Sequence, residues 1–246
     1  MELTQAFFQL QLSFADKVAQ VTHAPLEEVL LDYTTLYLSF ELGRSFDPAH
    51  PLWQAYLQGL KHAPDRAQWT YTWYQRQRTD FIADFYGCFY YSYLAEEQTI
   101  RIHFINRETA EQSALSQARR AARVQELASM FRTIQSTLPE ARLVRGGSWL
   151  YNLDAYRCLF PPEYIHTAQP ISDEFPFLAL WGQFLTRDGN LREPGTASFL
   201  ACLEQQTTLA GLTRCFPYQV LRPMCAIEHF YRFYAPWWES ADDVVS

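Results

Sequence analysis

The spacing of apolar residues predicts helices over the first eighty residues. Apolar side chains recur every three or four positions from Phe7 to Val21 and again from Leu26 to Phe40, as they do along one face of a helix. Gly43 is available to end the second of these helices. Pro51 introduces a further helix, and another is predicted from Asp65 to Arg76.

At Asp84 the apolar period changes from helical to two. This alternation predicts a strand up to Leu94, a polar turn over Glu96–Gln98 and a second strand from Ile100 to Phe104. The first strand is apolar on both faces. That pattern is typical of a sheet covered by helices on both sides.

The rest of the chain alternates helices and strands. An apolar stripe predicts a long helix from Ala110 to Leu138, which Pro139 ends. A strand is then predicted from Arg142 to Tyr151, followed by a short helix with Asn152 as its N-cap. The remaining expected elements are a buried strand over Phe175–Thr186, a turn at Asp188-Gly189, a helix near Thr196–Gln206, a strand over Tyr218–Leu221 and a closing helix from Pro223 to Tyr234.

These elements predict one α+β domain over residues 1–246, with helices first and then a mostly antiparallel mixed sheet flanked by helices. A soft boundary lies near residues 79–84. It would separate a helical lobe, residues 1–80, from a sheet-containing lobe, residues 84–246, whose aromatic residues are expected to share one core.

Composition excludes several classes of protein. The aromatic content of 16% is high and indicates a compact fold. The net charge of -7 argues against binding nucleic acid through phosphate neutralisation. The apolar runs are too short to cross a membrane, and no basic region precedes an apolar stretch at the N-terminus, so we expect a soluble cytoplasmic protein.

The cysteines and histidines do not form a known metal motif. The five cysteines are widely spaced in apolar contexts, which favours reduced thiols in the core over a disulfide framework. No HExxH or CxxC spacing is present, so no metal site is predicted.

A glycine pair marks the most plausible ligand site. Two glycines inside an apolar strand usually indicate a bulge or the close approach of a ligand or another backbone. Gly146 and Gly147 would open their amides to an anion or an acyl carbonyl, Arg145 would supply charge, and Trp149 would wall an apolar pocket. The alternative is a bulged strand with a core tryptophan.

Candidate catalytic groups lie on the neighbouring strand. His103 is expected on the face opposite Ile100 and Ile102, where it could reach Ser148 and act as a general base. A structural histidine is the alternative, because no acidic residue can be named to orient the ring.

Two arginine features could bind anions. Arg222 directly precedes Pro223 and an expected helix start, where exposed amides favour an anion, although a structural ion pair is the alternative. Arg119, Arg120 and Arg123 form a basic run on the long helix that could hold phosphates. A solvated helix face is the favoured interpretation of that run.

The segment from Ile100 to Phe184 resembles a known family. Its strand Ile100–Ile105, long helix, Pro139-Glu140, strand, Ser148-Trp149-Leu150, short helix and Leu159–Pro162 are similar to the C-terminal half of bacterial GNAT-related acyltransferase-like proteins. The resemblance implies a GNAT-like mixed sheet. It also implies CoA or acyl-CoA as the ligand.

The chain departs from that family at the acyl-CoA pyrophosphate loop. The pattern of Arg or Gln, two residues, Gly, one residue, Gly or Ala has no clear match, and Arg145-Gly146-Gly147 is not that loop. The expected function is acyl-CoA-dependent N-acyl transfer, with a small ligand bound in an aromatic cleft near Trp149. The alternative is a noncatalytic ligand-binding or assembly protein, which could form a homo-oligomer.

Overall fold

The computed structural model describes residues 2–43, 46–77, 83–108, 113–171 and 179–242, and side chains as far as residue 238. The chain divides into two compact units. Unit 1 comprises residues 1–81 and 173–218, and unit 2 comprises residues 82–172 and 219–246. Most of the boundary predicted at residues 79–84 lies outside the described residues. The chain then returns to unit 1 through a segment that the sequence had grouped with the sheet.

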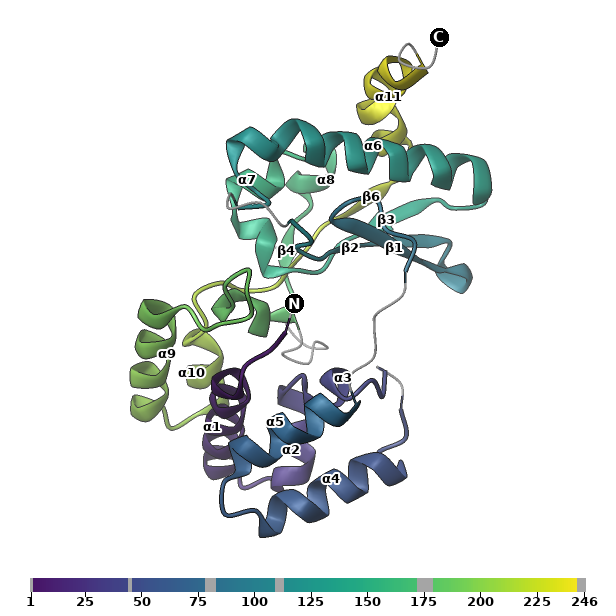
Figure 1. Cartoon of the computed structure of the whole chain (residues 1–246). Helices are drawn as coiled ribbons and strands as arrows, with labels where there is room; N and C mark the ends of the chain where they lie inside the picture. Colours follow the sequence, from purple (N-terminus) through teal and green to yellow (C-terminus); the bar gives the residue numbers. More distant parts are fainter. Residues whose placement is uncertain (1, 44–45, 78–82, 109–112, 172–178, 243–246) are drawn as a thin grey trace. The chain divides into compact units, whose positions relative to one another are not determined.

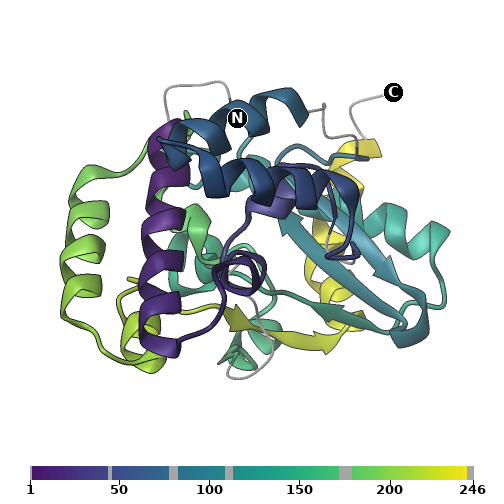
Figure 2. The same cartoon turned by 90° about the horizontal axis from the view of Figure 1, so that it is seen from below.

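Unit 1 is helical. Its central helix α1 contacts α2, α5, α9 and α10, and Figure 2 shows α1 beside the two later helices. Phe14 of α1 packs edge-on against Trp181 and Phe216 at centroid distances of 5.5 and 5.2 Å. The elements are α1 (Gln5–Thr22), α2 (Leu26–Tyr33), α3 (Leu36–Ser39), α4 (Pro51–His62), α5 (Arg66–Gln77), the 3₁₀ helix η5 (Trp181–Phe184), α9 (Glu193–Gln205) and α10 (Leu209–Arg214).

Unit 2 contains a four-stranded mixed sheet in the order β1-β2-β3-β6. Only β2 and β3 run parallel, joined through α6, and the other neighbouring pairs are antiparallel. The elements are β1 (Phe89–Leu94), η1 (Ala95–Glu97), β2 (Thr99–Phe104), η2 (Gln117–Arg119), α6 (Arg120–Thr137), β3 (Leu143–Arg145), η3 (Trp149–Asn152), α7 (Asp154–Arg157), α8 (Pro162–His166), β4 (Gln169–Pro170), β5 (Leu221–Arg222), β6 (Met224–Ala226) and α11 (Glu228–Asp242).

Helices α6 and α11 of unit 2 contact each other, and α6 runs along the sheet while α11 crosses it (Figure 1). The core beneath them takes Phe89, Ile100 and Ile102 from the hairpin and Val144 from β3. The opposite face of the hairpin carries two polar cross-strand pairs, Tyr90–His103 and Ser92–Arg101. All four residues are half-buried. The predicted mixed sheet flanked by helices is therefore present.

The helix predicted from Leu26 to Phe40 is interrupted. Thr34 is extended, with φ -124° and ψ 172°, and its hydroxyl donates to the Leu30 carbonyl. The amide and hydroxyl of Thr35 both donate to Gln11 Oε1, at 2.7 and 2.9 Å. The buried side chain of Gln11 on α1 thus accepts hydrogen bonds at the point where the helix is interrupted. The apolar spacing of this segment could not reveal that distant partner.

The strand predicted over Phe175–Thr186 is wrong where the structure describes it. Residues 175–178 lie outside the described residues, and Trp181–Phe184 form a 3₁₀ helix. Trp181 Nε1 donates to the Tyr33 carbonyl at 3.1 Å, which fixes the indole in the core of unit 1. A short apolar run does not by itself distinguish a strand from a buried helical turn.

Several predicted boundaries also move. Helix α6 begins at Arg120 rather than near Ala110, and residues 110–112 lie outside the described part of the chain. Strand β3 ends at Arg145. After it, the amides of Gly146 and Ser148 donate to the carbonyls of Pro223 and Leu221, in the segment that precedes β6. Asn152 ends η3 instead of capping a helix, and its side chain donates to two carbonyls.

The expected closing helix also begins later. Pro223 lies between β5 and β6, and α11 starts only at Glu228. Of the strand predicted over Tyr218–Leu221, only Leu221 lies in a strand, β5, which pairs with β4. Proline cannot donate to a ladder and is tolerated at such an interruption.

Two of the five cysteines are not free thiols. Cys202 on α9 and Cys215 after α10 form a disulfide with a Cα–Cα distance of 5.6 Å. Cys88, Cys158 and Cys225 are free. The expectation of reduced thiols is therefore wrong for the pair that the α9–α10 turn brings together, because proximity in the fold and not sequence spacing decides which cysteines meet.

Candidate functional site

The glycine pair predicted as a ligand site is built into the protein core. Gly146 donates its amide to the Pro223 carbonyl at 3.0 Å, so this amide is not open to a carbonyl oxygen of a substrate. A Cβ on Gly146 would lie 2.3 Å from Tyr151 Oη and 2.5 Å from Tyr164 Oη. The close neighbours of this glycine are thus two buried tyrosine hydroxyls. Gly147 has open space around its Cα instead.

Arg145 and Ser148 each have a structural partner. Arg145 Nη1 pairs with Glu97 Oε2 at 2.9 Å, in the turn between β1 and β2. Ser148 Oγ accepts the amide hydrogen of Leu150 at 3.1 Å and caps η3. Both side chains therefore stabilise the ends of local elements.

The structure brings His103 together with Ser92. His103 Nε2 and Ser92 Oγ are 3.0 Å apart, and the imidazole stacks on Tyr90 at a centroid distance of 4.5 Å. His103 faces away from Ile100 and Ile102, as expected. The β2–β3 ladder ends at the Arg101–Arg145 pair, before the register that would have placed His103 near Ser148.

The two remaining predicted residues are half-buried. Trp149 begins η3, and its carbonyl accepts a hydrogen bond from Asn152. Arg222 lies on β5, opposite Gln169 of β4. Because no helix begins at Pro223, the helix-terminus argument for an anion at Arg222 is wrong.

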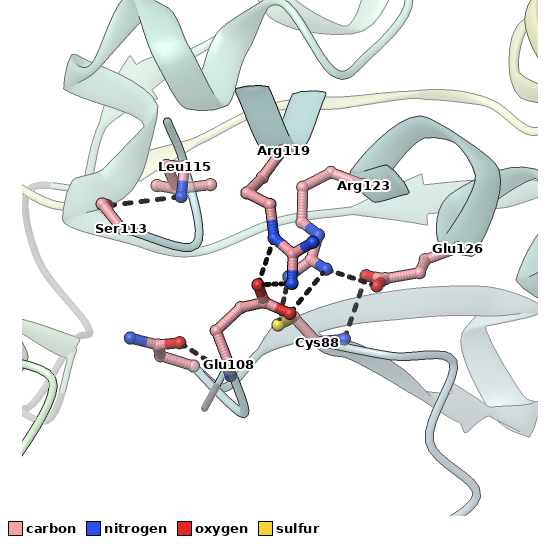
Figure 3. Close-up of polar contacts among 8 residues, drawn as sticks. Cys88, Glu108, Ser113, Leu115, Arg119, Arg123 and Glu126 are labelled. Carbon is pink, nitrogen blue, oxygen red and sulfur yellow. Dashed lines mark hydrogen bonds and ion pairs between the residues drawn. The ribbon is translucent and has the colours of Figure 1, made fainter. Parts of the chain in front are cut away.

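A buried charge network lies instead at the beginning of α6 (Figure 3). Arg123, on the second turn of α6, is only 3% exposed, which is unusual for an arginine. Its Nη2 lies 2.6 Å from Glu126 Oε1 and 3.4 Å from Glu108 Oε1. Glu108 also pairs with Arg119, the residue directly before α6. The two arginines and two glutamates thus form three ion pairs in a continuous cluster.

The start of the hairpin closes this network. The Cys88 amide donates to Glu126 Oε2 at 3.0 Å, and Arg123 Nη1 donates to Cys88 Sγ. Gly87 has φ +60°, and a Cβ there would lie 1.9 Å from the Glu126 carboxyl carbon. A glycine at this position therefore allows both the turn and the close approach of the carboxylate.

The environment shifts the pKa values of the acids in opposite directions. Burial raises the pKa of Glu126 above its ordinary value, although the Cys88 amide and Arg123 partly oppose this. The hydrogen bond from Arg119 lowers the pKa of Glu108. Burial also raises the pKa of the Cys88 thiol, which therefore stays protonated at neutral pH. The site holds one acid that ionises readily and one that resists ionisation.

We expect Glu126 to make stability depend on pH in a defined direction. Because its pKa is raised in the folded state, ionised Glu126 costs stability at pH values above that pKa, and this cost disappears as the pH falls toward its ordinary value of 4.5. Urea unfolding of wild-type and Glu126→Gln proteins between pH 5 and 8 tests this. The stability of the wild type relative to the variant should rise as the pH falls, and a constant difference would contradict it.

A cavity of about 390 Å³ adjoins the network at the start of α6. Its polar lining comes from the turn before the helix and from the first helical turns, with Ser116, Gln117, Arg120 and Arg123. The opposite wall comes from α7 and the turn after it. The full lining is Leu115, Ser116, Gln117, Arg120, Arg123, Asp154, Ala155, Cys158 and Leu159.

Polar groups of this lining lack partners. Within the described part of the chain, no group pairs with the buried Arg123 Nε or with the buried Ser116 Oγ. Arg120 is exposed, and the amides that begin η2 and α6 carry the positive end of the helix dipole. Asp154 is the one carboxylate of the lining, and it is near Arg157 at 3.4 Å. Because Arg123 is already paired with Glu108 and Glu126, the groups that favour an anion in this cavity are Arg120, the unpaired Nε of Arg123 and the helix amides.

The basic run Arg119, Arg120 and Arg123 is therefore not simply a solvated face, as the sequence favoured. Arg123 is buried and Arg119 is paired, whereas Arg120 is exposed as expected. One sequence signal for this ion pair was available: Glu126 follows Arg123 by three residues, a spacing that places the two charges on one helix face. Glu108 and Cys88 come from distant segments and gave no such signal.

Among the described residues, no group of three or more histidine, cysteine, aspartate or glutamate side chains is arranged to hold a metal ion. No described helix has the length and apolar character needed to span a bilayer. Comparisons of the chain with family models, curated proteins and solved structures found no match.

Proposed function

We propose that unit 2 binds the phosphate groups of an acyl-CoA-type ligand at the start of α6 and supports acyl transfer from it. The observation that carries the binding site is the buried Arg123, which lines a cavity together with Ser116 and Arg120. Arginine and helix N-termini are both suited to phosphate oxygens. At about 30 Å³ for a water-sized group, the cavity of about 390 Å³ has room for a diphosphate and not for a whole CoA.

The order of elements supports the choice of ligand. Strand β2 of the antiparallel hairpin, helix α6 and parallel strand β3 follow one another in the order that underlies the resemblance to GNAT-related proteins. The segment between β2 and α6 would replace the missing pyrophosphate motif of that family, with side chains rather than glycine-rich backbone as donors. In this proposal His103 remains the candidate base.

Ligand binding without catalysis is the second candidate function. Gly146, Arg145 and Ser148 already have partners in the protein, so these groups offer a substrate fewer free donors than the acyl-transfer mechanism requires. A phosphate-binding cavity would serve either function. The two candidates differ only in whether the bound acyl group is transferred.

Calorimetric titration with CoA and acetyl-CoA tests the binding site. We expect one-site binding that weakens with added salt, and Arg120→Met should reduce the affinity by about tenfold, because a charge-assisted hydrogen bond is lost. Arg132→Met, on the same helix but outside the cavity lining, is the matched control and should bind like the wild type. Absence of binding, or equal affinity in Arg120→Met, would rule out the proposed site.

A second assay separates the two candidate functions. If acyl transfer occurs, acetyl-CoA with a panel of primary amines should release free CoA thiol, and His103→Gln should slow that release without changing CoA affinity. Binding at the cavity with no thiol release above the uncatalysed rate would support the noncatalytic function.

A further inference from the structure

Unit 1 contains a second, chemically different cavity of about 290 Å³ between α2 and α4. Four leucines form its apolar part: Leu26 and Leu30 from α2, and Leu57 and Leu60 from α4. Leu30 and Leu60 are buried, whereas Leu26 and Leu57 are half-buried. The cavity is therefore a leucine-lined depression with an opening.

The polar part of this lining carries a net positive charge. It consists of Lys61 at the end of α4, Arg66 at the start of α5, and Glu27 of α2. Lys61 and Glu27 are exposed, and the described residues provide no ion-pair partner for Lys61. With two cations and one carboxylate, the opening favours a ligand with a single negative charge.

Arg66 has one amino group committed and one without a partner. Its Nη1 binds both carboxylate oxygens of Asp16, at 3.0 and 3.2 Å. Its Nη2 is buried, and no described group accepts a hydrogen bond from it. A buried donor on a charged group without an acceptor is costly. A carboxylate in the cavity would supply that acceptor after a small shift of the side chain.

We propose that this cavity binds a medium-chain aliphatic carboxylate. The tail would lie against the four leucines, and the carboxylate would accept hydrogen bonds from Arg66 and Lys61. At about 30 Å³ for each non-hydrogen group, the cavity of about 290 Å³ holds roughly ten, which is the size of octanoate. This site lies in unit 1 and does not depend on the function proposed for unit 2.

The test is titration of the whole chain with sodium octanoate, followed by calorimetry or by intrinsic tryptophan fluorescence. We expect saturable one-site binding with a Kd of about 1 mM or tighter. Octylammonium should bind at least about tenfold more weakly because it carries the opposite charge, and octanol should also bind more weakly than octanoate because it lacks the carboxylate. Equal binding of all three, or no saturation up to about 10 mM, would overturn the proposal.

Four variants locate the site. Arg66→Gln should weaken octanoate binding by about tenfold, because it removes a charge-assisted hydrogen bond. Asp16→Asn breaks the same ion pair without touching the cavity and should retain wild-type affinity or better. Glu27→Gln removes the repelling charge and should strengthen binding. Leu57→Trp fills the cavity, and retained binding in this variant, with its fold verified by circular dichroism, would place the ligand elsewhere.

Discussion

Replacing Arg123 with methionine is expected to lower the free energy of unfolding by about 3–5 kcal/mol at pH 7, because the carboxylate of Glu126 then lacks its buried counter-charge and Glu108 keeps only Arg119. Methionine keeps most of the side-chain length and packs in a similar volume, so the change is mainly electrostatic. Urea unfolding followed by circular dichroism measures the loss. The effect is large because Arg123 is only 3% exposed and both acids are mostly buried.

Arg120→Met is the matched control for this experiment. Arg120 lies on the same helix three residues earlier but is exposed, so its replacement should change stability by no more than about 0.5 kcal/mol. The loss in Arg123→Met should also shrink as the pH falls, because the pKa of Glu126 is already raised and protonation removes its charge. A loss in Arg123→Met as small as that in Arg120→Met would contradict the role of the network in stability.

Replacing Gly146 with alanine is expected to lower the free energy of unfolding by about 1–3 kcal/mol through overpacking. The added methyl group would lie within 2.6 Å of atoms of Tyr151 and Tyr164. These two hydroxyls are hydrogen-bonded to each other at 2.9 Å, and both tyrosines are almost fully buried. The rings cannot move aside without disturbing the core of unit 2.

The neighbouring glycine provides a control for the Gly146 variant. A Cβ on Gly147 would meet no atom within 4 Å, and this residue has no positive φ, so Gly147→Ala should change stability by at most about 0.5 kcal/mol. Thermal unfolding of the two variants under the same conditions compares them directly. Equal melting temperatures would show that the tyrosine pair accommodates the methyl group and that the tight packing at Gly146 is unimportant.

The glycine pair shows where sequence reasoning about the site stops. Two glycines in an apolar strand correctly indicated a close approach of other atoms. Whether those atoms belonged to a ligand or to the protein depended on residues 5 and 18 positions later, which fold back onto Gly146. The hypothesis of an open amide at Gly146 was therefore wrong, although a close approach does occur there.

The arginines on α6 show the opposite case. The apolar stripe of this segment predicted a helix and placed the basic run away from the stripe, on a side that is normally solvated. The buried position of Arg123 follows from Glu108 and Cys88, which come from the segments around β1 and β2. No periodicity within one helix can report partners supplied by another segment.

Local periodicity was sufficient to predict helix α1, helices α4 and α5, the β1–β2 hairpin and the main part of α6. These depend on interactions within a few residues, so a window of the sequence contains their signal. The break at Thr34, the 3₁₀ helix at Trp181–Phe184, the Cys202–Cys215 disulfide and the burial of Arg123 arise from contacts made on folding. Each of these depends on a partner far along the chain, and hydrogen bonds, ion pairs and disulfides form only where folding places both partners within reach.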